Sequence, residues 1–151
     1  MIQTRPLFTL TVQVPRVVDL GDTPNGHRRI ATVSGGTFKG ERLNGTVQAP
    51  PGGDWILVRT DGTMVLDVRL TLETDDKQLV YMSYRGLRHG PKDVIARLNA
   101  GEAVDPSTYY FRTTPVFETA SKKYDWLNRI VAVATGRREA SGPIYDVFEV
   151  L

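Results

Sequence analysis

Apolar and polar residues alternate along most of this chain, with the period of two that a half-buried β-strand produces. Apolar side chains occupy every second position from Phe8 to Val14 and again from Met64 to Leu72. Asp61-Gly62 stands between two apolar runs, which is a strong signal for a tight β-hairpin. We therefore expect Trp55–Thr60 and Thr63–Thr74 to pair antiparallel.

Glycine and proline residues indicate where these strands bend or end. Gly35-Gly36 interrupts a β-branched run, which is typical of a bulge or a barrel corner. The sequence "PPGGD" at Pro50–Asp54 predicts a turn, and Asp19–His27 is predicted to be a long exposed loop. Pro115 lies inside an apolar run and favours an edge position or a bulge there.

One segment, "PKDVIARLNAGEAV", has a helical pattern instead. Pro91 suits the start of a helix, and Gly101 is a plausible stop. Between them, Val94, Ile95 and Leu98 have the spacing of one helical face. The stretch "YRGLRHGP" before it is predicted to join the end of a strand to this helix.

These patterns predict an all-β fold of eight to nine strands with one short helix. Long antiparallel strands, glycine corners and a three-strand meander favour a small closed or nearly closed barrel, with a strongly curved sandwich as the alternative. Closure also removes the exposed strand edges that such apolar strands would otherwise present. At 151 residues the chain, 1–151, is expected to form a single β-barrel domain.

Composition narrows the classes of function. There are 19 basic and 17 acidic side chains and no block of like charges, so no nucleic-acid partner is expected. No apolar run is long enough for a membrane helix, the N-terminal segment resembles a strand more than a signal peptide, and cysteine is absent. The expected location is the cytoplasm, with no membrane partner.

Recognised catalytic motifs are absent. The chain lacks a Walker loop and a nucleophile elbow. With only His27 and His89, a three-histidine metal site is impossible, and we predict neither a metal nor a cofactor. His89 has the intrinsic pKa of a general acid or base, although a plain turn histidine is the alternative interpretation.

Charged residues alternate with aliphatic ones on the central strands. Asp67 and Arg69 share one face of Thr63–Thr74, and sequence alone leaves open whether this face is the lumen or the outer surface. If it is the lumen, charged pairs and aromatic walls there would form a ligand site. The candidate catalytic residues are Asp67, Arg69, His89 and Arg112, and the candidate ligand-binding residues are Trp55, Arg59, Tyr84, Arg88, Trp126 and Asn128.

Several stretches together resemble the family of small bacterial and fungal proteins known as domain of unknown function 3237. They are "GGTFKGERLNGTV", "GGDWILVRTDGTMVLDVRLTLETDD", "YRGLRHGP", "YYFRTTPVFET" and "YDWLNRIVAVATG", within a resemblance that covers roughly residues 5 to 150. The residues at the recurring positions are Trp55, Arg59, Asp61, Asp67, Arg69, Tyr84, Gly86, Arg88, Phe111, Arg112, Trp126, Leu127 and Asn128.

The resemblance implies a small antiparallel barrel of calycin-like type that is often a dimer, so a homodimer is expected. It also implies enzymes or binders that act on small organic, often aromatic, molecules without a known cofactor, and it leaves the reaction open. The mixture of aromatic side chains with alternating charged residues on the strands predicts a cofactor-independent lyase, isomerase or hydratase for an aromatic or apolar, possibly anionic, compound. A ligand-binding barrel without turnover, and a subunit whose barrel face only mediates assembly, are the alternatives.

Overall fold

The computed structural model describes all residues from 1 to 151. Ten strands form one antiparallel sheet, which closes on itself because β5 pairs with β6. The strands are β1 (Thr4–Gln13), β2 (Arg16–Thr23), β3 (Gly26–Thr32), β4 (Gly35–Lys39), β5 (Asn44–Val58), β6 (Met64–Thr74), β7 (Leu79–His89), β8 (Tyr110–Glu118), β9 (Val131–Glu139) and β10 (Gly142–Val150). The predicted closed barrel is therefore confirmed.

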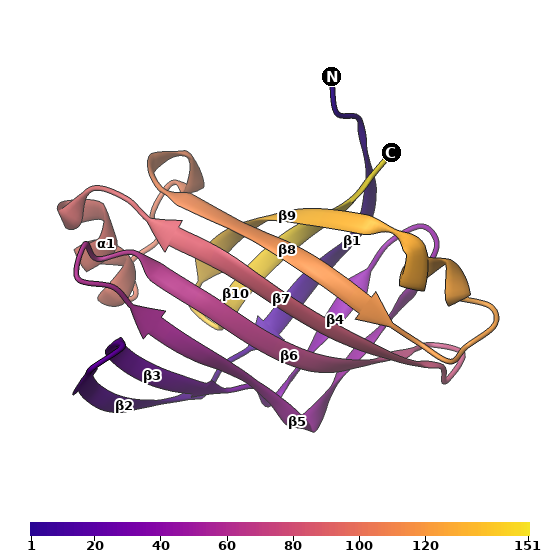
Figure 1. Ribbon diagram of the computed structural model, residues 1–151, viewed down its shortest axis with the longest axis horizontal. Coiled ribbons are helices and arrows are strands. Elements are labelled where there is room, and N and C mark those ends of the chain that lie inside the picture. Colours follow the sequence, from indigo (N-terminus) through magenta and orange to yellow (C-terminus); the bar gives the residue numbers. More distant parts are fainter.

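Eight of these strands make the barrel wall, in the order β5-β4-β1-β10-β9-β8-β7-β6. The other two, β2 and β3, form a hairpin that extends the sheet beyond the C-terminal half of β5. The short helix α1 (Lys92–Asn99) follows β7, and 3-10 turns lie at Pro106–Thr108 and Asp125–Arg129. In Figure 1, α1 and the β2–β3 hairpin lie at the same end of the barrel, and the turn at Asp125–Arg129 lies at the opposite end.

The helix begins and ends where the sequence indicates. Pro91 immediately precedes its first residue, and Gly101 follows its cap with a φ of 81°. That backbone conformation is open to glycine at little cost. Val94 and Leu98 are the buried residues of the helix. No helix in the structure has the length and apolar character needed to cross a lipid bilayer.

Three local predictions were wrong. Asp19–His27 is not a loop, since it forms most of the β2–β3 hairpin. Pro50–Asp54 is not a turn, because β5 continues through it and absorbs the prolines as an irregularity between Gln48 and Gly52. The sequence "YDWLNRIVAVATGRRE", from Tyr124 to Glu139, has the pattern of a strand followed by a turn, but it begins with a 3-10 turn at Asp125–Arg129. In the first two cases, pairing with neighbouring strands overrides the local turn signal.

Pro115, in contrast, behaves as expected. On the β7 side it lies opposite Tyr84, whereas β9 pairs with β8 only at Arg112 and Thr113. The strand edge at Pro115 that faces β9 therefore needs no N–H donor, which is the condition that proline requires.

The barrel is filled at one end and hollow at the other. At the filled end, the Phe8 ring lies 5.4 Å from that of Phe38 and 5.9 Å from that of Phe117, centroid to centroid. Leu127, from the 3-10 turn, is fully buried in the same core. Burying each of these side chains contributes about 1.5–3 kcal/mol of transfer free energy. This packed end supports the open end, where the candidate site lies.

Candidate functional site

A cavity of about 370 Å³ occupies the lumen at the end near α1 and the β2–β3 hairpin. Twenty residues line it and thirteen of them are hydrophobic, so most of its wall is apolar. The side chains that carry a charge or a hydrogen-bonding group, the hydroxyls of the two tyrosines among the hydrophobic residues included, come from several strands and α1: Asp19, Arg29, Asp54, Tyr84, Arg88, Asn99, Arg138 and Tyr145. An apolar pocket with a few converging polar groups is typical of a small-molecule site.

Asp54 is the buried acid of this cavity. It lies on β5 next to Trp55, whose side chain takes the opposite face, and only 9% of Asp54 is exposed. Desolvation by burial raises the pKa of Asp54 to about 6, against the lowering effects of a hydrogen bond from the Asp67 backbone N–H and of the Arg88 charge. A carboxyl group with this pKa exchanges protons near neutral pH.

Two tyrosines stand beside Asp54 in the cavity wall. Tyr84 on β7 and Tyr145 on β10 are both buried, and their ring centroids lie 5.1 Å apart in an edge-on arrangement. Burial raises the pKa of both phenols, and the Asp54 charge adds to the effect. Both hydroxyls therefore remain protonated at neutral pH and can donate hydrogen bonds.

Arg88 brings a positive charge into the same cavity. It is 7% exposed, and its Nη2 donates a 3.2 Å hydrogen bond to Oδ1 of Asn99 on α1. Burial and the nearby charge of Arg138 lower the pKa of Arg88, although a guanidinium stays protonated in proteins. Its Nε is buried without a hydrogen-bond partner, and no carboxylate lies within ion-pair distance.

The mouth of the cavity carries further charges. Nε of Arg29 on β3 lies 3.5 Å from Oδ2 of Asp19 on β2, an ion pair in which the buried Nε makes no hydrogen bond. Asp19 also contacts the His27 ring at 2.7 Å, so the hairpin is held together by charged groups. Arg138 on β9 completes the lining.

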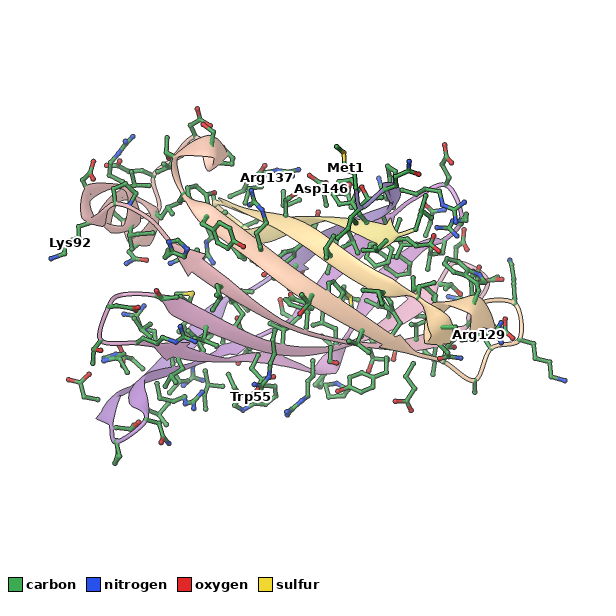
Figure 2. The ribbon with its side chains drawn as sticks, turned by 45° about the horizontal axis from the view of Figure 1, so that its top comes forward. Met1, Trp55, Lys92, Arg129, Arg137 and Asp146 are labelled. Carbon is green, nitrogen blue, oxygen red and sulfur yellow. The ribbon has the colours of Figure 1, made fainter.

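Of the residues predicted from sequence, Tyr84 and Arg88 lie in this cavity. Asp67, Arg69 and Trp55 lie on the outer face of the wall instead. Asp67 is 3.9 Å from Arg69 and 3.7 Å from Arg85, and the Arg69 guanidinium stacks over the Trp55 ring. Figure 2 shows Trp55 pointing away from the barrel. The register that buries Leu66, Val68 and Leu70 forces the alternate side chains outward.

Arg59, Arg112 and His89 are also outside the lumen. Arg59 and Arg112 border a shallow groove on the outer surface, and the Arg112 guanidinium lies 5.1 Å from the Tyr110 ring. His89 is exposed at the end of β7 and stacks on Tyr110 with the ring centroids 4.9 Å apart. These side chains come together with one another but not with Asp54.

Trp126 and Asn128, the last two residues predicted from sequence, lie at the opposite end of the barrel. Arg42 stacks over the Trp126 ring at 4.2 Å. The Asn128 side chain accepts a hydrogen bond from the Thr119 N–H at 2.8 Å and donates one to the Thr119 carbonyl at 2.9 Å. Both therefore contribute to local structure far from the cavity.

Sequence reasoning missed Asp54, Tyr145, Arg29, Arg138 and Asn99. The sequence predicts a turn at Asp54, because the signal of Pro50 to Gly53 outweighs the strand that continues there. Extending the alternation of Trp55–Thr60 one residue backwards would have placed Asp54 on the face opposite Trp55. Nothing in the sequence distinguishes Arg29 and Arg138 from surface arginines.

No group of three or more histidine or acidic side chains is arranged to hold a metal ion. The polar groups of the cavity are instead one carboxyl group at its wall, two neutral phenols, three guanidinium groups and the Asn99 amide, with Asp19 at the mouth. Such a set can move a proton, donate hydrogen bonds to an oxygen atom and attract an anion.

A family profile described as "Protein of unknown function (DUF3237)" matches residues 2–150. A UPF0311 protein of Rhodopseudomonas palustris is 37% identical over 150 residues, which is 99% of this chain and 97% of that protein.

Solved structures show the same barrel. A β-barrel-like protein from Acinetobacter baumannii is 41% identical with a TM-score of 0.87, over 100% of this chain and 97% of that one. A protein of unknown function from Rhodopseudomonas palustris is 37% identical with a TM-score of 0.95, over 100% of this chain and 99% of that one. An enzyme from Penicillium herquei is 19% identical with a TM-score of 0.74, over 99% of this chain and 95% of that one. It is similar in fold alone.

Proposed function

This chain belongs to the DUF3237 family, and we propose that it is a small-molecule-binding barrel that catalyses a proton transfer without a cofactor. The site is the lumen cavity and the proton carrier is Asp54. Among lyase, isomerase and hydratase reactions, isomerisation needs the fewest catalytic groups besides Asp54, and an elimination by a lyase or a dehydration by a hydratase would begin with the same removal of a proton.

Asp54 is the single observation that carries the proposal. A carboxyl group that is only 9% exposed, in the wall of an apolar cavity, with a pKa of about 6, has the environment of a general base. Surface carboxylates such as Asp125 lack that environment, since they are exposed to water.

The tyrosines supply the complementary half of the chemistry. In the proposed reaction, the Asp54 carboxylate takes a proton from a carbon next to a substrate carbonyl. The electron pair moves to the carbonyl oxygen, where a hydroxyl of Tyr84 or Tyr145 donates a hydrogen bond to the enolate. The proton on Asp54 can exchange with solvent, and Asp54 then returns one proton to a carbon of the conjugated system, so atoms and charge balance.

The cavity wall defines the kind of substrate. Val12, Ile56, Leu66 and Val68 line it, and Phe111 contributes an aromatic ring. We infer a substrate with an apolar or aromatic body that displaces water when it enters. The Penicillium herquei enzyme is consistent with this proposal, since its fold is shared and accommodates catalysis.

Deuterium exchange tests the proposal on model compounds that share the expected chemistry. The purified protein is incubated in D₂O with a panel of aryl ketones and β,γ-unsaturated ketones, and proton NMR records loss of the signal next to the carbonyl. We expect protein-dependent exchange for part of the panel. Asp54→Asn should slow it by about 10²–10⁴-fold, the usual contribution of a general base, and Asp125→Asn should not change it.

Two results would count against the proposal. Exchange that persists in Asp54→Asn would show that another group moves the proton. Binding of panel compounds in the lumen without any exchange would favour the alternative of a ligand-binding barrel without turnover. A melting temperature of Asp54→Asn that is not below that of the wild type is the control for folding.

A further inference from the structure

We propose that the substrate carries a carboxylate, which Arg88 binds inside the lumen with help from Arg29 and Arg138 at the mouth. This inference rests on the lumen being the site, as in the proposed function, but it concerns a different group of residues. It specifies the substrate as an organic acid with an apolar body.

Arg88 is the starting point, because its charge is buried and has no counter-charge. Its hydrogen bond goes to a neutral amide, that of Asn99, and its Nε has no partner. A buried cation without an acidic partner is strongly unfavourable unless other contacts stabilise it. A ligand carboxylate would meet this need, because two of its oxygens match the planar fork of a guanidinium.

Asp54 does not take that role. It lies near enough for the Arg88 charge to lower its pKa, yet burial has the larger effect and keeps that pKa near 6. The two residues form no ion pair within 4.0 Å in the structure, and the Asp54 carboxylate instead accepts a hydrogen bond from the backbone of β6. Arg88 therefore remains available to an anion from outside the chain.

The charges at the mouth favour the same ligand. Arg29 is paired with Asp19 through its Nε, which lies 3.5 Å from Oδ2 without forming a hydrogen bond, and Arg138 forms no ion pair. Three arginines thus face two carboxylates around the cavity. The excess of positive charge attracts anions toward the opening and focuses the field inside an apolar wall.

The size and lining of the cavity distinguish an organic acid from an inorganic anion. About 370 Å³ of mostly apolar space is far more than the space a phosphate or sulfate ion needs. Hydrophobic walls gain free energy only if an apolar body covers them. A single negative charge on such a body matches the small excess of arginines better than a doubly charged phosphate does.

A pair of probes tests this inference on the unaltered protein. 2-Naphthoate and 2-naphthamide have nearly the same shape and differ in charge, and calorimetry at low ionic strength measures the affinity for each. We expect the naphthoate to bind at least about tenfold more tightly, as a charge-assisted hydrogen bond in a buried site would give. Equal affinities, or no detectable binding of either probe at millimolar concentration, would overturn the inference.

Substitutions then identify the residue responsible. Arg88→Gln should remove the preference for naphthoate, and Arg88→Lys should keep part of it. Arg85→Gln is the matched control, because Arg85 lies three residues earlier on β7 with its side chain 77% exposed on the outer face. If Arg88→Gln kept the full preference, the inference would be wrong, and near-ultraviolet circular dichroism verifies that each variant has folded.

Asp54→Asn separates this inference from the proposed function. If naphthoate is preferred but Asp54→Asn leaves deuterium exchange unchanged, the acid-binding role stands and the general base is wrong. If exchange depends on Asp54, and the neutral ketones of the panel exchange as fast as analogues that carry a carboxylate, the general base stands and the acid-binding role is wrong.

Discussion

Oδ1 of Asp54 accepts a 3.0 Å hydrogen bond from the backbone N–H of Asp67, across the pairing of β5 with β6. The two carboxyl groups lie on opposite sides of the barrel wall, one in the cavity and the other among the arginines of the outer face. The backbone bond partly compensates the cost of burying the Asp54 charge, while the Asp67 charge raises the pKa of Asp54. The Asp54 carboxyl group can therefore ionise near neutral pH, but its charged form is less stable than it would be in water.

Stability should therefore depend on pH through Asp54. Its pKa is about 6 in the folded protein and about 3.8 in the unfolded chain, so the folded state binds the proton more tightly. The stabilising contribution of this proton is complete below about pH 4 and is lost as the pH rises through about 6. By about pH 7 the loss amounts to ~3 kcal/mol relative to a residue that does not titrate.

Asp54→Asn removes this titration and keeps an oxygen that accepts the Asp67 N–H. Urea unfolding should show that the variant gains roughly 3 kcal/mol on the wild type between about pH 4 and pH 7. Asp67→Asn is the control and should show no comparable gain, since that side chain lies outside the cavity. A pH-independent difference between Asp54→Asn and wild type would contradict the pKa of Asp54.

The exchange reaction should follow the same ionisation. Only the carboxylate form of Asp54 accepts a proton, so the exchange rate should increase with pH and level off above about 7. The tyrosines do not disturb this profile, because their raised pKa values keep them protonated throughout. Rates measured by NMR across this range test the expectation, and a rate that falls as the pH rises would indicate a general acid instead.

The barrel follows from the sequence because strand alternation is a local property. The hairpin at Asp61-Gly62 and the helix between Pro91 and Gly101 each depend on a few neighbouring residues, and both are where the sequence places them. The β2–β3 hairpin depends on pairing with β5, more than twenty residues away, so its local turn signals were misleading.

The site was harder to predict, because charge type does not indicate which face of a strand is the lumen. Arg85 and Arg88 illustrate this, since they share a strand and a side-chain type but face opposite sides of the wall. Only the register of the whole barrel decides which one is buried. The same register places Asp54 in the lumen and Asp67 outside it. The clear alternation of Thr63–Thr74 drew attention to Asp67, whereas Asp54 follows a turn signal.

Filling the cavity should abolish binding without unfolding the barrel. Val68 lies on β6 opposite Tyr84 and lines the lumen, so the larger ring of Val68→Phe would occupy space that a ligand needs. We expect loss of 2-naphthoate binding, with a change in unfolding free energy within about 1–3 kcal/mol. Val131→Phe is the control, because Val131 is exposed on the outer face and should leave binding unchanged.

Gly36, at the start of β4, should tolerate a side chain far less well than Gly62 in the hairpin turn. A Cβ at Gly36 would lie 2.1 Å from the Thr11 carbonyl oxygen, with a φ of 151°, whereas a Cβ at Gly62 would meet no atom within 4 Å. Gly62→Ala should cost about 1 kcal/mol for its positive φ, and Gly36→Ala about 3 kcal/mol or more, because strand β4 must move away from β1. Denaturant unfolding compares them, and equal losses would argue against a tight corner.

Affinity for an organic acid should also depend on the charge of Asp54. Ionised Asp54 repels a ligand carboxylate at Arg88, and protonated Asp54 does not. Binding of 2-naphthoate should therefore weaken by about threefold to tenfold as the pH rises through about 6, an effect of the size that a partly screened like charge produces. By linkage, bound naphthoate should raise the pKa of Asp54 by the matching amount.

Other charged groups around the cavity do not produce this profile. Arg29, Arg88 and Arg138 stay positive, and a hydrogen bond from the Gly21 backbone lowers the pKa of Asp19, so it stays ionised. His27, whose pKa is raised by Asp22 and Asp19, titrates in the wild type and in Asp54→Asn alike. The affinity of Asp54→Asn should thus lack the step near pH 6, and a step retained in this variant would assign it to the hairpin.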